Sequence, residues 1–318
     1  MIQPTSQYAY FQGQIVPIEQ AQVSILTQAL HYGTGTFGGM RAYWNAEQEQ
    51  LYIYRPYDHF KRLLNSAALL RMNLGHTPQS LLDVLLTLIR KEGFRTNCYI
   101  RPLAYISEET LAVRVHDLKA DLAIVVRPLG DSSYVNIDEG AHVCFSAWRR
   151  VDDNAIPARG KIAGAYVNSM MIKSDAMLAG YDDALVLNND GHVSEFSAAN
   201  FFMVRDGVAI TPPITDNVLE GIIRRSLIQM LRDEMGIEVV ERNVDRTEVY
   251  MADEIFMCGT GAQISPVTRI EHRPVGSGAI GRITSDLRQL FMDVVYGRVE
   301  KYRSWVAPVY QAETVQTG

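Results

Sequence analysis

The chain has 318 residues, 47% hydrophobic and 21% charged, which fits a globular protein with a substantial core in one large or two medium domains. Its formal net charge of -6 argues against nucleic acid or an anionic membrane surface as the main partner. The three cysteines are widely spaced and predict neither a disulfide framework nor a zinc site. No signal-peptide pattern and no apolar run long enough to cross a bilayer is present, so we expect a cytoplasmic protein without a membrane or metal partner.

The first part of the chain predicts strands with two helices between them. Residues 8–16 are typical of a hairpin that turns at Gln12-Gly13. A glycine-rich segment follows, and then two amphipathic helices, the first capped by Asp58. The second helix is expected at about residues 78–92, and two buried strands at 98–106 and 121–128.

The second part of the chain alternates less regularly between helix and strand. Residues 128–139 are rich in Pro, Gly, Ser and Asp and are the best linker candidate. Helices are expected at about 165–180, 220–236 and 279–300. Three strands are expected between residues 183 and 213, separated by turns at Asn189–Gly191 and Asp206-Gly207. Because helices and strands occur in blocks, we predict an α+β fold of two domains, residues 1–133 and 134–318.

Lys161 stands out among the lysines because its neighbours are small and apolar. The surrounding sequence is GKIAGAYVNS, with no acidic residue within five positions after the lysine. A poorly solvated ammonium has a lowered pKa, and the free amine can then form a Schiff base with an aldehyde cofactor. On these residues alone, a solvent-exposed lysine on a glycine-rich turn is the more common alternative.

Other residues fit a pyridoxal phosphate site, which needs anion donors for the phosphate and an acid for the pyridine nitrogen. Glu195 has apolar neighbours, so a half-buried carboxylate that needs a cationic partner is plausible. Glycines at 219–223 (LEGII) and 258–262 (CGTGA) precede a helix or form a turn, where backbone N–H groups bind phosphate. Arg101 lies within an apolar strand and should be paired or bind a carboxylate.

Six motifs resemble, in the same order, segments of the branched-chain amino acid aminotransferases of the fold-type IV (class IV) pyridoxal phosphate family. They are ALHYGTGTFGGMR (29–41), RLLNSA (62–67), YIRP (99–102), SEFSAANFF (194–202), LEGIIR (219–224) and MCGTGAQISPV (257–267). The resemblance runs from about residue 8 to 300. It implies a two-domain α+β fold of the D-amino-acid-aminotransferase type, with pyridoxal 5'-phosphate bound to Lys161.

The resemblance also implies roles for individual residues. Cofactor contacts are implied for Arg62, Ile222, Ile223 and Thr260 (phosphate), Tyr166 (ring hydroxyl), Glu195 (pyridine nitrogen) and Lys161 (covalent attachment and proton transfer). Substrate contacts are implied for Tyr32, Phe37, Arg41, Tyr99, Arg101, Tyr134, Thr260 and Gly261. The substrates implied are L-Val, L-Leu, L-Ile and L-Glu with their 2-oxo acids, with an extension to aromatic donors. Tyr32 would reach the site of a neighbouring subunit, which implies a homodimer or a higher homo-oligomer.

Three positions depart from the family pattern, and they leave the donor range open. Gly38 stands where the family has Glu, Ile223 where it has Thr, and Gly261 where it has Ala. We expect Gly38 to leave space near the pocket wall and to widen tolerance for bulky donors. The alternatives are a D-amino-acid or (R)-amine transaminase, an aminodeoxychorismate lyase of the same fold, or a binding protein that merely keeps the fold.

Overall fold

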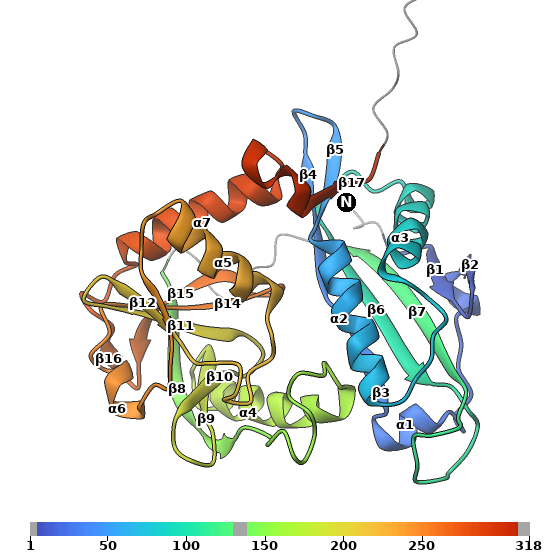
Figure 1. Ribbon diagram of the computed structural model, residues 1–318, viewed down its shortest axis with the longest axis horizontal. Coiled ribbons are helices and arrows are strands. Elements are labelled where there is room, and N and C mark those ends of the chain that lie inside the picture. Colours follow the sequence, from blue (N-terminus) through green and yellow to red (C-terminus); the bar gives the residue numbers. More distant parts are fainter. Residues whose placement is uncertain (1–4, 130–138, 311–318) are drawn as a thin grey trace, which may run out of the picture. The chain divides into compact units, whose positions relative to one another are not determined.

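The structure is a computed structural model that describes residues 5–129 and 139–310 (Figure 1). Its contacts divide the chain into two compact units. The first unit contains the residues up to 129 and those from Met292 onward, and the second unit extends from residue 139 to Phe291. Residues from 292 onward therefore group with the first unit, whereas we expected the second domain to continue to residue 318. Most of the expected linker at 128–139 lies outside the described residues.

The first unit is built on an antiparallel sheet with the order β17-β5-β4-β6-β7-β1-β2, and β3 pairs with β6. The predicted hairpin is confirmed, because Gln12 and Gly13 both have positive φ angles, as a two-residue hairpin turn requires. The strands are β1 (Tyr8–Phe11), β2 (Gln14–Pro17), β3 (Gly35–Phe37), β4 (Met40–Asn45), β5 (Gln50–Tyr54), β6 (Cys98–Ile106), β7 (Ala120–Pro128) and β17 (Val306–Pro308).

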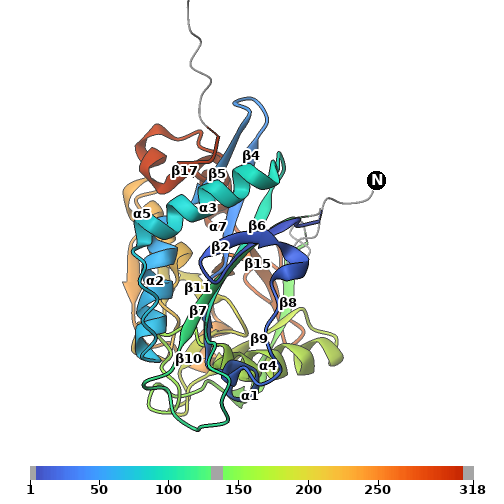
Figure 2. The ribbon, with the colours of Figure 1, turned by 90° about the vertical axis from the view of Figure 1, so that its right-hand side faces the viewer.

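Two helices of this unit, α2 (Pro56–Leu69) and α3 (Pro78–Glu92), pack on the sheet and on each other (Figures 1 and 2). Their apolar faces join alternate strand residues in one core cluster. Asp58 does not cap the first helix as predicted: it lies inside the first turn and pairs with Arg55 at 2.7 Å. The shorter helices are α1 (Gln28–Tyr32), η1 (Ile18–Gln20) and η3 (Glu300–Trp305).

Strands β6 and β7 are not buried along their whole length, contrary to the prediction. Every second residue of β6 is fully buried against the helices, whereas Tyr99, Arg101 and Leu103 on the other face retain exposure. Successive side chains in a strand point to opposite faces, so this exposed row belongs to the face away from the core.

The second unit contains a mixed sheet with the order β10-β9-β8-β15-β14-β11-β12-β13, and β16 pairs with β15. We expected three strands between residues 183 and 213, and the structure has four. The middle strand is broken at Ser197–Ala199, where the N–H of Phe196 donates to the carbonyl of Ala199 at 2.8 Å. The strands are β8 (Ala141–Arg149), β9 (Asp183–Leu187), β10 (Val193–Phe196), β11 (Asn200–Arg205), β12 (Val208–Thr211), β13 (Val239–Glu241), β14 (Glu254–Gly259), β15 (Gln263–Ile270) and β16 (Arg273–Pro274).

Three helices lie close to their predicted positions: α4 (Tyr166–Leu178), which follows η2 (Ala163–Ala165), α5 (Ile222–Asp233) and α7 (Arg282–Val295). Helix α4 packs on β8 and β9, and α5 on β13 and β14. A short helix, α6, spans Arg246–Val249. No helix within the described residues is both long and apolar enough to span a membrane.

Candidate active site

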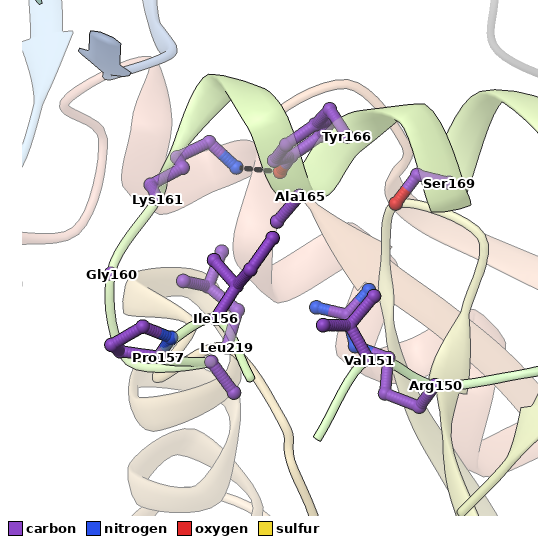
Figure 3. A pocket seen from close by; sticks show the side chains of 11 residues that line it. Arg150, Val151, Ile156, Pro157, Gly160, Lys161, Ala165, Tyr166, Ser169 and Leu219 are labelled. Carbon is purple, nitrogen blue, oxygen red and sulfur yellow. Dashed lines mark hydrogen bonds between the residues drawn. The ribbon is translucent and has the colours of Figure 1, made fainter. Parts of the chain in front are cut away.

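Lys161 lies in a pocket of the second unit, directly before η2 and α4 (Figure 3). Its side chain is half-buried, and its amine donates a hydrogen bond to the hydroxyl of Tyr166, the first residue of α4. The amine also lies 4.9 Å from the centroid of the Tyr166 ring. The pocket lining consists of Arg150, Val151, Ile156, Pro157, Ala158, Gly160, Lys161, Ala165, Tyr166, Ser169 and Leu219. An amine is thus held beside a phenol at a concave surface.

Glu195 is buried in β10, with 4% of its surface exposed. One carboxylate oxygen, Oε1, pairs with the guanidinium of Arg150 at 2.8 Å. The other oxygen, Oε2, accepts hydrogen bonds from the side-chain amide of Asn200 at 2.9 Å and from the backbone N–H of Leu219 at 3.3 Å. Glu195 is therefore fixed by donors from three separate segments, as a buried charge requires.

The environment of Glu195 contains opposing electrostatic effects. Burial raises the pKa of Glu195 above its ordinary value, and the positive charges of Arg150 and then Lys161 oppose this rise in pKa. The amine of Lys161 consequently acts electrostatically on the carboxyl group, which ties Glu195 to the pocket that Lys161 lines. Such a carboxyl group favours a cation, or a protonated ring nitrogen, placed next to it.

The first turn of α5 offers backbone N–H groups at Ile222 and Ile223. Its N-cap residue is Gly221, and no described side chain caps this helix. The N-terminal N–H groups of a helix have no partner within the helix, and together with the helix dipole they favour an anion such as phosphate. Thr260 and Gly261 form the turn between β14 and β15, and both retain partial exposure.

Gly221 has a specific reason to lack a side chain. A Cβ added there would overlap the Oδ1 atom of Asn200 and lie 3.0 Å from its Cγ. The amide of Asn200 donates to Glu195 and also to the carbonyl of Leu219 at 3.0 Å. The close approach of the backbone at Gly221 therefore allows Asn200 to hold Glu195.

Four of the predicted substrate residues lie on one face of the first unit's sheet. Arg41 of β4 is the Cα partner of Tyr99 of β6, and Phe37 of β3 is the partner of Leu103. Arg101 donates to the hydroxyl of Tyr99 at 2.8 Å, and its guanidinium lies 4.7 Å from the centroid of the Phe37 ring. An aromatic surface with an exposed guanidinium can accept both an apolar side chain and a carboxylate.

The other predicted residues of the first unit lie on helices. Arg62 is half-buried on α2. Tyr32 is the last residue of α1; it is 41% exposed, and its hydroxyl donates to the carbonyl of Leu111 of the same chain at 2.8 Å. Tyr134 lies outside the described residues.

The expectation that Gly38 leaves open space is wrong for the space directly beside its Cα, where a side chain would begin. A Cβ added at Gly38 would lie 2.7 Å from Cγ and 3.3 Å from Cδ of Pro102. The proline ring already occupies the volume where a side chain at position 38 would begin. Any larger residue at this position requires the Pro102 ring to move.

Sequence reasoning missed Arg150 and gave Asn200 no role. The requirement that a buried acid at position 195 has a cationic partner could have suggested an arginine, and Asn200 is the conspicuous amide of the SEFSAANFF motif. The pairing of Arg150 with Glu195 joins two separate segments, which no local pattern in the sequence indicates.

Comparisons with known proteins identify the family of the chain. The family model "Amino-transferase class IV" matches residues 35–270. A probable branched-chain-amino-acid aminotransferase of Aquifex aeolicus is 43% identical over 95% of this chain and 97% of its own length.

Solved structures extend the similarity to the fold. The branched-chain amino acid aminotransferase of Thermobaculum terrenum in its PLP-form is 38% identical, covers 97% of this chain and 100% of its own, and gives a TM-score of 0.92. Two further structures, from T.th., are of a branched-chain amino acid aminotransferase. Both are 38% identical to this chain, cover 96% of it and 99% of their own chain, and give a TM-score of 0.90. One is complexed with N-(5'-phosphopyridoxyl)-L-glutamate and the other with 4-methylvaleric acid. The predicted α+β fold is confirmed, and the chain belongs to the class IV aminotransferase family, among the branched-chain-amino-acid aminotransferases.

Proposed function

We propose that this protein transfers amino groups between branched-chain L-amino acids and 2-oxoglutarate, with pyridoxal 5'-phosphate bound at Lys161. The observation that carries the proposal is the pairing of the Lys161 amine with Tyr166, in a pocket whose electrostatics extend to the buried Glu195. The relatives crystallised with the phosphopyridoxyl derivative of glutamate and with 4-methylvaleric acid support this pair of substrates.

The donors of the second unit fit this cofactor. Lys161 would hold the aldehyde carbon covalently, Tyr166 the ring hydroxyl and Glu195 the ring nitrogen. The phosphate would bind the N–H groups at the start of α5, since no described side chain caps that end of the helix. Thr260 would add a hydroxyl, and Arg62 of the first unit a guanidinium fork.

Each residue has a definite task in the reaction. When bound, pyridoxal phosphate supplies an aldehyde that receives the amino group and a ring that accepts the electron pair left at the substrate Cα. The Lys161 amine would act as the general base that removes the proton from the substrate Cα and then as the general acid that delivers it to the cofactor carbon C4′. Tyr166 positions that amine by accepting its hydrogen bond. Glu195 would keep a proton on the ring nitrogen through its negative charge.

The substrate would bind on the face formed by Phe37, Arg41, Tyr99 and Arg101, with its α-carboxylate at Tyr99 and the backbone of Thr260 and Gly261. Apolar side chains would pack on the aromatic rings, and the γ-carboxylate of glutamate would meet the guanidinium of Arg101. Tyr134 completes the predicted set.

We also propose a homodimer as the smallest active form, located in the cytoplasm, with Tyr32 reaching the partner's site. Tyr32 is 41% exposed, which leaves part of the residue available for such a contact. Light scattering after size exclusion should give twice the chain mass of 35.7 kDa or a multiple of it. A monomer with full activity would refute this part of the proposal.

An absorption experiment tests the activity. The purified chain with pyridoxal phosphate should show a visible band that L-leucine removes and 2-oxoglutarate restores. Borohydride should then fix the cofactor on Lys161. A response to D-alanine, (R)-1-phenylethylamine or aminodeoxychorismate in place of L-leucine would assign the chain to one of the rival reactions. Protein that stays colourless would refute catalysis by this cofactor.

A further inference from the structure

Arg150 connects three segments around the buried acid. It follows the last residue of β8, and its backbone N–H donates to the carbonyl of Leu187 at 3.0 Å. Its Nε donates to the carbonyl of Asn217 at 3.2 Å, while its terminal nitrogen pairs with Oε1 of Glu195 at 2.8 Å. Only 11% of its side chain is exposed. Figure 3 shows its guanidinium pointing into the pocket that Lys161 lines.

Both carboxylate oxygens of Glu195 accept hydrogen bonds. A carboxylate offers about four acceptor positions. Arg150 takes one on Oε1, and Asn200 and Leu219 take two on Oε2. About one position remains, enough for a single N–H donor such as a protonated ring nitrogen.

Arg150 differs from the other charged group near Glu195 in one respect. The ionisable groups that interact with Glu195 in the described part of the chain are Arg150, Lys161 and Cys258. Burial raises the pKa of Cys258, so this thiol remains neutral. The amine of Lys161 changes its charge and bonding during the proposed reaction, whereas an arginine stays charged at every working pH. Arg150 is therefore the constant positive charge beside Glu195.

We propose that Arg150 is a positioning residue that holds Glu195 ionised and aimed at the ring nitrogen of the cofactor, whatever the state of Lys161. This inference rests on the proposed function for the identity of the cofactor. The pairing of Arg150 with Glu195 is independent of it. Without the guanidinium, burial would favour the neutral acid, which cannot keep a proton on the ring nitrogen.

The test uses the full chain with Arg150→Gln, which keeps a donor but loses the charge, and Arg150→Lys, which keeps the charge. Arg159→Gln is the matched control, because this nearby arginine pairs with Glu220 at 3.0 Å but is 48% exposed. Infrared difference spectra of the cofactor-free protein follow the titration of Glu195, identified by the band that Glu195→Gln lacks. Binding of pyridoxal phosphate and the pH dependence of its visible band are then measured.

We expect Arg150→Gln to raise the midpoint of the Glu195 titration by at least about one pH unit and to weaken cofactor binding by about tenfold or more, since one unit corresponds to a factor of ten. Arg150→Lys should keep most of the native titration midpoint and of the native cofactor affinity. Arg159→Gln should have the midpoint and affinity of the native protein. An unchanged midpoint in Arg150→Gln, or an equal shift in Arg150→Lys, overturns the inference. If Arg150→Gln does not fold, Arg150→Lys keeps the inference falsifiable, because a midpoint raised by about one pH unit although the charge is kept would overturn it.

The two readouts separate this inference from the proposed function. If the native protein binds no pyridoxal phosphate, the proposed function fails. The infrared titration still shows whether Arg150 controls the ionisation of Glu195. If the cofactor binds the native protein and Arg150→Gln equally well, the function stands and the positioning role of Arg150 is refuted.

Discussion

Replacing Gly221 by alanine tests how the backbone at the start of α5 supports the buried acid. The φ and ψ angles of Gly221 are -67° and 128°, which alanine adopts without strain, so the effect of the methyl group comes from contacts alone. That methyl group would overlap Oδ1 of Asn200 and lie 3.1 Å from Cβ of Arg224. Asn200 must then move away.

The expected cost follows from the two hydrogen bonds that Asn200 would lose. Its amide donates to the carboxylate of Glu195 at 2.9 Å and to the carbonyl of Leu219 at 3.0 Å. A hydrogen bond to a charged group contributes about 1.5–3 kcal/mol and a neutral one about 0.5–1.5 kcal/mol, so Gly221→Ala should lower the free energy of unfolding by about 2–4.5 kcal/mol. Cofactor binding should weaken as well, because Glu195 loses a donor that fixes it.

Urea unfolding and titration with pyridoxal phosphate measure both effects. Gly259→Ala is the matched control, since a Cβ there would meet no atom closer than 3.8 Å. The double variant Gly221→Ala/Asn200→Ala should be less destabilised than the sum of the single variants, because the overlap disappears with the amide. Additive effects, or a Gly221→Ala variant as stable as the native protein, would refute the role of Asn200.

Three further predictions concern the site and the surface. Lys161→Ala should lower the transamination rate by at least about 10²–10⁴-fold, because the general base is lost. Borohydride should leave no cofactor attached to this variant; a labelled variant would identify another lysine as the attachment site. Arg101→Met should lower kcat/KM for glutamate by roughly 10–100-fold, because a hydrogen bond between charged groups is lost, and should leave kcat/KM for leucine nearly unchanged. The control is Arg95→Met, which removes a 70% exposed arginine before the start of β6 and should change neither value of kcat/KM. The pKa of His192 is raised above 6.5, first through its hydrogen bond with Asp190, so its contribution to stability is complete below pH 6.5 and is lost as the pH rises through the folded-state value. Asp190→Asn should return the NMR titration of His192 toward 6.5 and leave His142 unaffected; an unmoved His192 would contradict the assignment.

Much of the local structure could be predicted because its causes are local. The hairpin at Gln12-Gly13 and the helix over residues 78–92 depend on turn chemistry, capping and apolar periodicity, which adjacent residues determine. Motif resemblance assigned Lys161 and Tyr166 to one cofactor site without predicting a contact between them, and the short helix η2 between them brings the two side chains together. The predicted roles in cofactor and substrate binding stay predictions.

The features that were missed depend on distant parts of the chain. The apolar run through SEFSAANFF predicts one continuous strand, yet β10 pairs with β9 while β11 pairs with β14, so the two halves follow different neighbours. The capping role predicted for Asp58, by contrast, is wrong for a local reason: the helix begins earlier, at Pro56, a residue favoured at the first helical position. The partnership of Arg150 with Glu195 joins residues from two separate segments of the second unit.

The position of β17 has a consequence for how the protein is made. Residues Val306–Pro308 add the edge strand next to β5, with Val306 opposite Tyr54 and Pro308 opposite Tyr52. During synthesis this border of the first sheet stays unpaired until residues 306–308 have left the ribosome, long after β5 has been made, and exposed strand borders invite pairing with other chains. Chains that stop short of residue 306 should therefore aggregate even though every residue near Lys161 has already been made.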